Sequence, residues 1–190
     1  QVPLGIAGPV HIKGDCVDGE FIIPLATSEG ALVASVNRGF KAAQYIETQL
    51  VQDWQTRAPV FSFSDKENAE QFVQFVMANF TTLKEVAEQT SNHLTLRKIE
   101  PFELDNIVWL RLEAETGEAM GMNMITVAAE AIGRFLEQET SAQFLSVSGN
   151  LCVDKKASQM TIDKGRGKKV VAAALISAET VASVLKTTPE

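Results

Sequence analysis

The spacing of apolar residues between Pro59 and Ser148 constrains the fold more than any other feature of the chain. Apolar side chains recur at every second position or at every third and fourth position, which are the periods of strands and helices. The predicted segments are, in chain order, a strand at 60–63, a helix at 65–88, strands at 94–99 and 107–114, a helix at 120–139 and a strand at 144–147. This βαββαβ order predicts a ferredoxin-like antiparallel sheet with two helices on one face.

The flanking segments follow a different pattern. Residues 1–26 predict two short strands around a polar turn, and residues 30–51 predict one amphipathic helix. We therefore expect an α+β protein in which a small domain, residues 59–147, is inserted into a larger domain. Residues 1–58 and 148–190 would belong to that larger domain, which is only partly present.

Charge and cysteine content exclude several classes of protein. A net charge of −7, a pI near 5.0 and the lack of a concentrated basic stretch argue against a nucleic-acid surface. Cys16 and Cys152 lie far apart, so a disulfide framework is not expected and a reducing compartment is favoured. These cysteines and the two histidines, His11 and His93, predict no metal site.

No apolar run is long enough to span a bilayer, and the first residues do not resemble a signal peptide. We therefore expect a cytoplasmic chain without a membrane segment. Gln1 begins an apolar, glycine- and proline-containing stretch with no initiator methionine. The chain is therefore expected to be a fragment of a longer polypeptide.

The nine residues from Ser148 to Lys156 combine a hydroxyl, an amide, a carboxylate and two adjacent cations. A buried lysine beside an aspartate can stabilise a developing oxyanion, which is often the largest catalytic effect. This pattern favours chemistry on an anionic or carbonyl-bearing ligand. A solvated turn after a strand is the alternative interpretation.

Glu29 lies where a predicted strand gives way to a predicted helix. Ser28 or Thr27 could cap that helix, and its backbone amides would favour and orient a carboxylate. An ordinary glutamate of a first helical turn is the alternative.

Residues 117–123 also lie between a predicted strand and a predicted helix. Glycines there permit close approach of a ligand to the backbone, and a helix N-terminus attracts phosphate. The segment lacks the G-x-G-x-x-G pattern of doubly wound nucleotide-binding folds. A tight turn with methionines filling gaps in the core is the alternative.

Four motifs resemble, in order, those of the 3-hydroxy-3-methylglutaryl coenzyme A (HMG-CoA) reductase family, and together they span nearly the whole chain. The motifs are Thr27–Gly39, Thr116–Met124, Ser148–Lys156 and Gly165–Lys168. The resemblance implies a small cofactor-binding domain inserted into a substrate domain. It also implies reduction of the HMG-CoA thioester to mevalonate and CoA by two hydride transfers from a nicotinamide cofactor.

The resemblance also implies roles for individual residues. Lys155 would stabilise the oxyanion, and Glu29 would donate a proton to the aldehyde-level intermediate. The residues expected to bind substrate are Ser148, Asn150, Asp154 and Lys156 around the hydroxymethylglutaryl group, Arg57 at its carboxylate, and Arg38 and Lys186 at the CoA phosphates. For Arg38 and Lys186, solvated helix charges are the alternative.

The cofactor implied by the resemblance is NADPH, with NADH as an open alternative. Family members that use NADPH carry an arginine before a phenylalanine in the first small-domain helix, where this chain has Asn79 and Phe80. Lys84 lies one turn further along and could supply the missing positive charge, but an exposed helical lysine is the favoured interpretation. The residues expected to bind the cofactor are Glu118, in place of the usual aspartate, and Met120, Gly121, Met122 and Asn123. No metal is implied.

Other motifs of the family are not present in the sequence: a Gly-Gln-Asp aspartate, a glycine-rich cofactor loop and a C-terminal histidine. The fragment alone is therefore expected to be inactive, and the complete enzyme to be a homodimer or larger homo-oligomer with sites at the subunit interface. Two alternatives stay open: a non-catalytic CoA- or nucleotide-binding module, and a CoA-thioester enzyme without redox chemistry. Glu29 and Lys155 weigh against the first, and the segment 118–123 weighs against the second.

Overall fold

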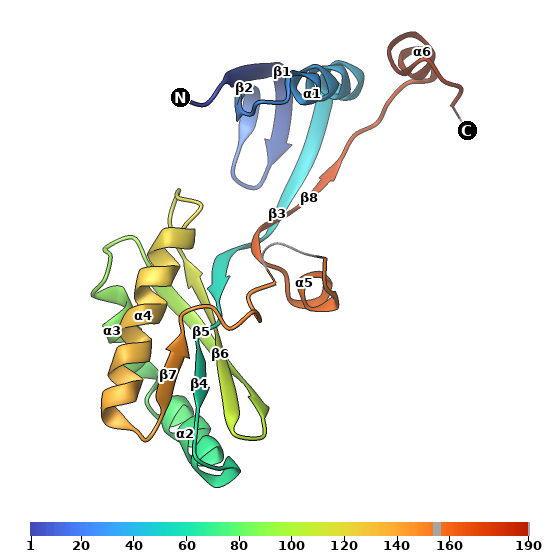
Figure 1. The fold of residues 1–190 in the computed structure, drawn as a ribbon. Coiled ribbons are helices and arrows are strands. Elements are labelled where there is room, and N and C mark those ends of the chain that lie inside the picture. Colours follow the sequence, from blue (N-terminus) through green and yellow to red (C-terminus); the bar gives the residue numbers. More distant parts are fainter. Residues whose placement is uncertain (154–156, 190) are drawn as a thin grey trace. The chain divides into compact units, whose positions relative to one another are not determined.

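The computed structural model describes residues 1–153 and 157–189 of a mixed α/β protein (Figure 1). The chain divides into two compact units. One contains residues 1–51 and 170–190, and the other contains residues 52–169. The second unit extends beyond both ends of the expected small domain, residues 59–147.

The first unit is built on an antiparallel pair of strands, β1 (Leu4–Gly14) and β2 (Asp18–Ala26). Helix α1 (Gly30–Ala43) packs against β1. The Asn37 side chain joins the two elements, because it accepts a hydrogen bond from the Gly8 amide (2.9 Å) and donates one to the Ile6 carbonyl (3.1 Å). A polar residue on the inner side of the helix thus fixes the helix to the strand.

The predicted helix at 30–51 is wrong beyond Ala43. The chain turns at Gln44, where φ is 56°, and continues as β3 (Tyr45–Arg57). Residues 45–48 pair in parallel with residues 11–14 of β1. Tyr45, Ile46 and Thr48 are aromatic or β-branched and favour strands, and the neighbouring strand supplies hydrogen-bond partners that helical spacing does not reveal.

The C-terminal elements of the chain are short. They are β8 (Gly167–Ala173), which pairs with β3, then α6 (Ala178–Thr180) and the π-helical turn η1 (Val181–Leu185). The turn η1 contacts α1. None of the helices in the described parts of the chain is both long enough and apolar enough to cross a membrane.

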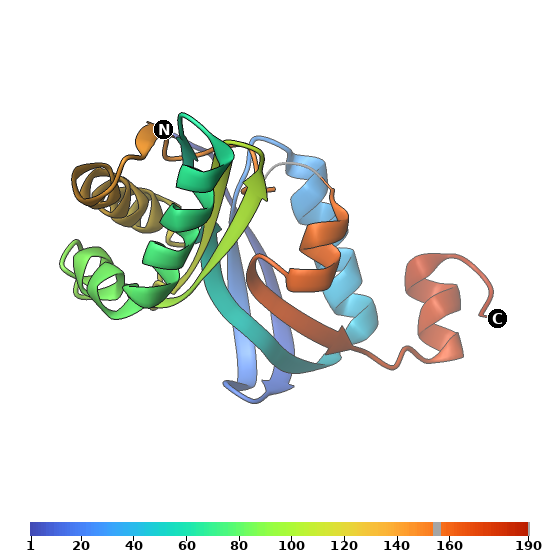
Figure 2. The same ribbon diagram turned by 90° about the horizontal axis from the view of Figure 1, so that it is seen from below.

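The second unit contains an antiparallel sheet with strand order β5-β6-β4-β7, and residues 55–57 of β3 also pair with β6. Its elements, in chain order, are β4 (Val60–Ser62), α2 (Lys66–Ala78), α3 (Phe80–Glu88), β5 (Thr95–Leu104), β6 (Ile107–Glu115), α4 (Met122–Glu139), β7 (Gln143–Ser146) and α5 (Gln159–Lys164). Helices α2, α3 and α4 lie on one side of this sheet and α5 lies on the other (Figure 2).

The single helix predicted at 65–88 is two helices, α2 and α3, separated at Asn79. The Asn79 side chain donates a hydrogen bond to the Phe75 carbonyl at 2.8 Å. Side-chain amides that bond to nearby backbone compete with helical hydrogen bonds, so an asparagine favours a helix end at this position.

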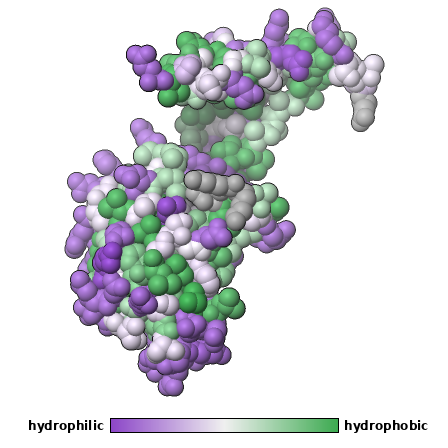
Figure 3. Space-filling view, viewed as in Figure 1, coloured by the Kyte–Doolittle hydropathy of each residue, from purple (hydrophilic) through white to green (hydrophobic). Residues whose placement is uncertain are grey.

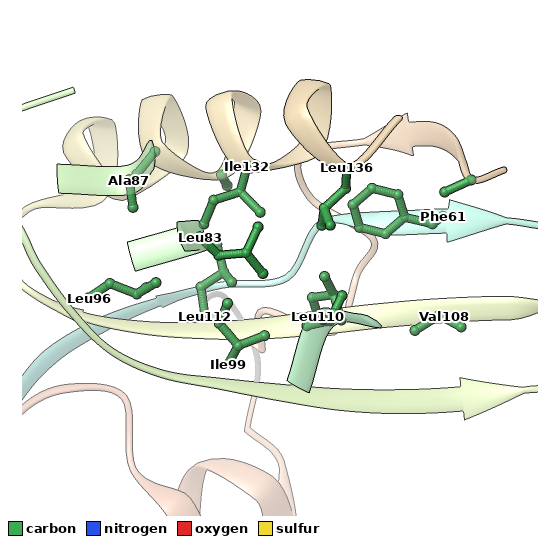
Figure 4. Packing of buried hydrophobic residues seen from close by; sticks show 14 of the residues in the cluster. Phe61, Leu83, Ala87, Leu96, Ile99, Val108, Leu110, Leu112, Ile132 and Leu136 are labelled. Atoms are coloured by element: carbon green, nitrogen blue, oxygen red, sulfur yellow. The ribbon is translucent and has the colours of Figure 1, made fainter. Parts of the chain in front are cut away.

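The core of the second unit lies between the sheet and α2–α4. Val108, Leu110 and Leu112 alternate along β6 and point toward this core, where they are fully buried (Figure 4). Ile132 and Leu136 reach them from α4. Burial of one such side chain contributes about 1.5–3 kcal/mol, so this layer holds the helices on the sheet.

On the face of this unit seen in Figure 3, hydrophilic and apolar side chains are mixed. Hydrophilic side chains cover much of the face seen in Figure 3 and interrupt its apolar spots. Met77, Leu104 and Leu145 are exposed singly on three different elements, which is ordinary for a protein surface.

Candidate functional site

The face of β6 that points away from the helices is covered by the chain that follows β7. This part of the chain is called here the return segment (residues 148–153 and 157–169). Trp109 and Arg111 alternate with the core residues of β6 and therefore point away from the helices. Trp109 Nε1 donates to the Gly149 carbonyl at 2.7 Å, and Arg111 Nη2 donates to the Gly165 carbonyl at 3.0 Å. The return segment is thus attached to the sheet at two points.

The first part of the return segment also contacts the end of β3. The Gly149 amide donates to the Ala58 carbonyl at 2.7 Å, and the Ala58 amide donates to Cys152 Sγ at 3.3 Å. Cys152 Sγ lies 3.3 Å from Ser148 Oγ. The buried thiol therefore connects Ser148 with the residue next to Arg57.

Gly149 permits this close approach. A Cβ atom at this position would lie 2.5 Å from Trp109 Cδ1 and 2.6 Å from Val60 Cβ. Asn150 follows with φ of 64° and an exposed side chain. Of the residues predicted to bind substrate, the structure places Arg57, Ser148 and Asn150 on neighbouring segments of this unit.

The predicted catalytic Lys155 and its neighbours Asp154 and Lys156 lie outside the described residues. Glu29, Arg38 and Lys186 belong to the first unit. Glu29 is the exposed residue that precedes α1, and its amide donates to Thr27 Oγ1 at 3.0 Å. The expectation that Ser28 or Thr27 caps α1 was wrong, because the N-cap residue is Glu29 and no side chain caps the helix.

Arg38 and Lys186 are both exposed. Arg38 lies on α1, and Lys186 ends the η1 turn in a left-handed conformation with φ of 60°. Since η1 contacts α1, the two cations lie on adjacent elements of the first unit.

The predicted cofactor motif forms the start of α4. Gly121 is the N-cap residue, with φ of 87°, and no side chain caps the helix. The nearby Thr116 hydroxyl does not cap α4, because it donates to the Ala119 carbonyl at 2.9 Å and closes the preceding turn. The first amides of α4 are therefore available to an anion, as at other uncapped helix starts.

Two adjoining pockets flank this helix start and share Ala119 and Met120. The first has a volume of about 320 Å³ and is lined by Asp53, Trp54, Gln55, Thr116, Glu118, Ala119, Met120, Gly167 and Lys168. The second has a volume of about 430 Å³ and is lined by Thr90, Ser91, Ala119, Met120, Gly121, Met122, Asn123, Met124 and Val127. All five residues predicted to bind the cofactor line one or both of these pockets.

Several lining residues were missed by sequence reasoning. Thr90 and Ser91 follow α3 at a turn with no motif of its own. Trp54 and Gln55 lie in β3, whose first part was mistaken for the end of a helix. Conversely, Asn79, which was matched to the family's phosphate-pairing arginine, lines neither pocket. The alternation of Ile46, Thr48 and Leu50 with Glu47 and Gln49 was the signal that could have identified the strand that carries Trp54 and Gln55.

Charged side chains cluster beneath the return segment. Arg111 is fully buried and pairs with Glu113, and its Nη1 lies 3.8 Å from Glu100 Oε2. Glu100 also pairs with Lys164, and Lys98 Nζ lies 3.6 Å from Glu100 Oε1. Burial alone would raise the pKa of Glu100, but the Lys164 hydrogen bond and the three nearby cations together lower this pKa below its usual value.

This lowered pKa makes the stability of the unit depend on pH. The folded-state pKa of Glu100 lies below the unfolded value of about 4.3, so its contribution is complete above that pH and is lost as the pH falls through the folded-state pKa. We expect Glu100→Gln to lower the free energy of unfolding most near neutral pH, and the difference from the original protein to shrink below about pH 4. Urea unfolding across this range measures it.

Glu103→Gln, at the exposed end of the same strand, is the matched control for loss of a carboxylate. A difference between Glu100→Gln and the original protein that stays constant from neutral to acidic pH would contradict the prediction.

Within the described residues, no group of three or more histidine, cysteine, aspartate or glutamate side chains is arranged to hold a metal ion. The fold and the pockets define a mixed α/β protein with two adjoining pockets at the start of α4, where Gly121 is the N-cap residue.

Comparison with known proteins identifies the family. A family model described as hydroxymethylglutaryl-coenzyme A reductase matches residues 1–190. The 3-hydroxy-3-methylglutaryl-coenzyme A reductase of Pyrococcus abyssi is 47% identical, over 100% of this chain and 48% of that protein. The reductase of Haloferax volcanii is 46% identical, over 100% and 48%. The chain belongs to the hydroxymethylglutaryl-coenzyme A reductase family, and it spans about half the length of these curated relatives.

Solved structures show the same fold. The 3-hydroxy-3-methylglutaryl-coenzyme A reductase of Streptococcus pneumoniae matches with a TM-score of 0.65 and 19% identity, over 98% of this chain and 50% of that one. The class II reductase of the same organism, bound to NADPH in open conformations, matches with a TM-score of 0.58 and 21% identity, over 77% and 41%.

Proposed function

We propose that the complete protein reduces the thioester of HMG-CoA to mevalonate and CoA. The observation that carries this proposal is the position of Glu118–Asn123, since this motif lines two adjoining pockets at the uncapped start of α4. A helix start of this kind suits the phosphates of a dinucleotide. Family membership of the whole chain provides the reaction class.

The cofactor that we propose is NADPH, which a solved reductase from Streptococcus pneumoniae binds. It would supply the two hydrides. Glu118, Met120, Gly121, Met122 and Asn123 would hold it, with the glycine allowing the ligand to approach the backbone. The described lining of the second pocket contains no lysine or arginine. NADH is therefore the alternative that the assay must test.

The substrate-binding residues that we propose are those that the family resemblance implies. Arg57 suits the substrate carboxylate, because a guanidinium can donate two parallel hydrogen bonds to it. Ser148, Asn150, Asp154 and Lys156 would surround the hydroxymethylglutaryl group, and Arg38 and Lys186 would bind the CoA phosphates.

Two residues would carry the chemistry. Lys155 would stabilise the oxyanion that develops on the thioester oxygen after the first hydride transfer. Collapse of that species releases the CoA thiolate and an aldehyde. Glu29 would deliver a proton as the second hydride reduces the aldehyde to the alcohol.

The domain arrangement is part of the proposal. The strand order β5-β6-β4-β7 and the placement of α2–α4 on one face support a ferredoxin-like, cofactor-binding domain. We propose that it corresponds to residues 59–147 and is inserted into a substrate domain containing residues 1–58 and 148–190. We also propose a cytoplasmic homodimer or larger homo-oligomer.

The test is an assay of the full-length protein with HMG-CoA and either NADPH or NADH, following the absorbance of the reduced nicotinamide and the release of free CoA thiol. We expect oxidation of two reduced cofactors for each CoA released. Release of CoA without oxidation would favour a thioester enzyme without redox chemistry. Binding of cofactor or CoA with neither reaction would favour a non-catalytic module.

A further inference from the structure

Arg111 is a fully buried arginine in the middle of β6 that none of the motifs includes. It lies on the face of the sheet opposite the apolar core. Glu113 and Glu100 neutralise its charge, and its Nη2 donates to the Gly165 carbonyl at 3.0 Å. Burying a guanidinium costs free energy unless it is paired and hydrogen-bonded. Loss of one of these partners would therefore disturb the positions of the others.

The carbonyl that Arg111 binds begins a tight turn. Gly165 and Gly167 both have φ of 68°, a backbone conformation that residues other than glycine rarely adopt. A Cβ atom on Gly165 would lie 2.9 Å from the Gln52 side-chain Cδ. The turn is therefore packed closely against β3, and its backbone can take only this narrow path.

This turn lines the first pocket and contacts one residue that lines the second. Gly167 and Lys168 line the first pocket, where Lys168 pairs with Asp53. Arg166 Nη2 lies 2.9 Å from Sδ of Met122, the first residue of α4 and part of the second pocket. A displacement of the turn would therefore move one wall of the first pocket and a contact to the start of α4.

We propose that Arg111 is a positioning residue, which acts on the two pockets by holding residues 165–168 in place. Its effect on nucleotide binding rests on the proposed function, because that function assigns the cofactor to the pockets. Lysine cannot replace it fully. A single ammonium lacks the planar fork with which Arg111 binds Glu113 and the Gly165 carbonyl at the same time.

The test uses Arg111→Met and Arg111→Lys in the full-length protein. Loss of a charge-assisted hydrogen bond corresponds to about a tenfold change in an equilibrium constant. We therefore expect Arg111→Met to raise the KM for the reduced cofactor about tenfold and to change the KM for HMG-CoA less than about twofold. Arg111→Lys should fall between Arg111→Met and the original protein.

A second measurement does not depend on activity. In Arg111→Met, the amides of residues 159–168 should exchange with deuterium about tenfold faster, while those of α2, on the opposite side of the sheet, should be unchanged. Arg134→Met is the control, because Arg134 also binds two glutamates, Glu130 and Glu137, but on the exposed face of α4. It should change neither the exchange of residues 159–168 nor the KM for the cofactor.

Two outcomes would overturn the inference: unchanged exchange at residues 159–168, or exchange that increases equally throughout residues 52–169, which would give Arg111 only a general structural role. If the original protein oxidises no reduced nicotinamide, the proposed function fails. The exchange measurement then still decides whether Arg111 positions the turn.

Discussion

Lys155→Ala is expected to lower kcat of the full-length protein by about 10²–10³-fold, because removal of one group that stabilises an oxyanion typically has this effect. The KM for HMG-CoA should change little. The proposed contact strengthens only as negative charge develops on the thioester oxygen, so its loss raises the barrier without weakening ground-state binding. Steady-state kinetics with NADPH and HMG-CoA measure both constants.

Ser148 is connected to the residue after Arg57 through Cys152, which precedes Lys155 by three residues in the sequence. Lys169→Ala is the matched control, because Lys169 is an exposed lysine of β8 outside the pockets. A kcat for Lys155→Ala within about twofold of the original value would exclude the proposed role of this amine.

Gly121→Ala is expected to destabilise the protein by about 2–4 kcal/mol and to weaken cofactor binding at least tenfold. Two effects add. The residue has φ of 87°, which an L side chain adopts only at a cost, and a Cβ would lie 2.5 Å from Cβ of the buried Thr116. Relief of this overlap must move the turn between β6 and α4, which lines both pockets.

Gly117→Ala separates the two effects. Gly117 has φ of 59°, but a Cβ at this position would meet no atom within 4 Å. We expect it to cost only about 1–2 kcal/mol from backbone strain and to leave the cofactor dissociation constant within about threefold. Thermal unfolding and titration with NADPH measure both. Equal losses in the two variants would show that the contact with Thr116 has no influence on the pockets.

Much of the second unit could be predicted from local pattern. Alternation at 107–114 identified β6, and the spacing of three and four residues at 120–139 identified α4, since both periods follow from backbone geometry within one element. The motif at 118–123 was likewise predicted to lie at the start of a helix. Glycine and the adjacent change of period indicate such a position without knowledge of any distant residue.

Local pattern was misleading where distant partners decide the conformation. Ile46 continues the helical spacing of the preceding residues, yet residues 45–48 form a strand because β1 pairs with them in parallel. Thr90 and Ser91 line a pocket with residues about thirty positions away along the chain. No spacing rule relates such positions, because their proximity results from packing of α3 against α4.

Apart from the break between α2 and α3, the sequence alone determined the order of strands and helices from 60 to 147. It also determined the family and which short motifs carry candidate chemistry. These depend on neighbours in the chain or on residue identity. Only the tertiary structure decided that Arg111 binds the carbonyl of Gly165, a residue 54 positions later, and that Cys152 links Ser148 to the end of β3. The physical reason is that a buried polar group takes whichever partner the folded chain brings within hydrogen-bond distance.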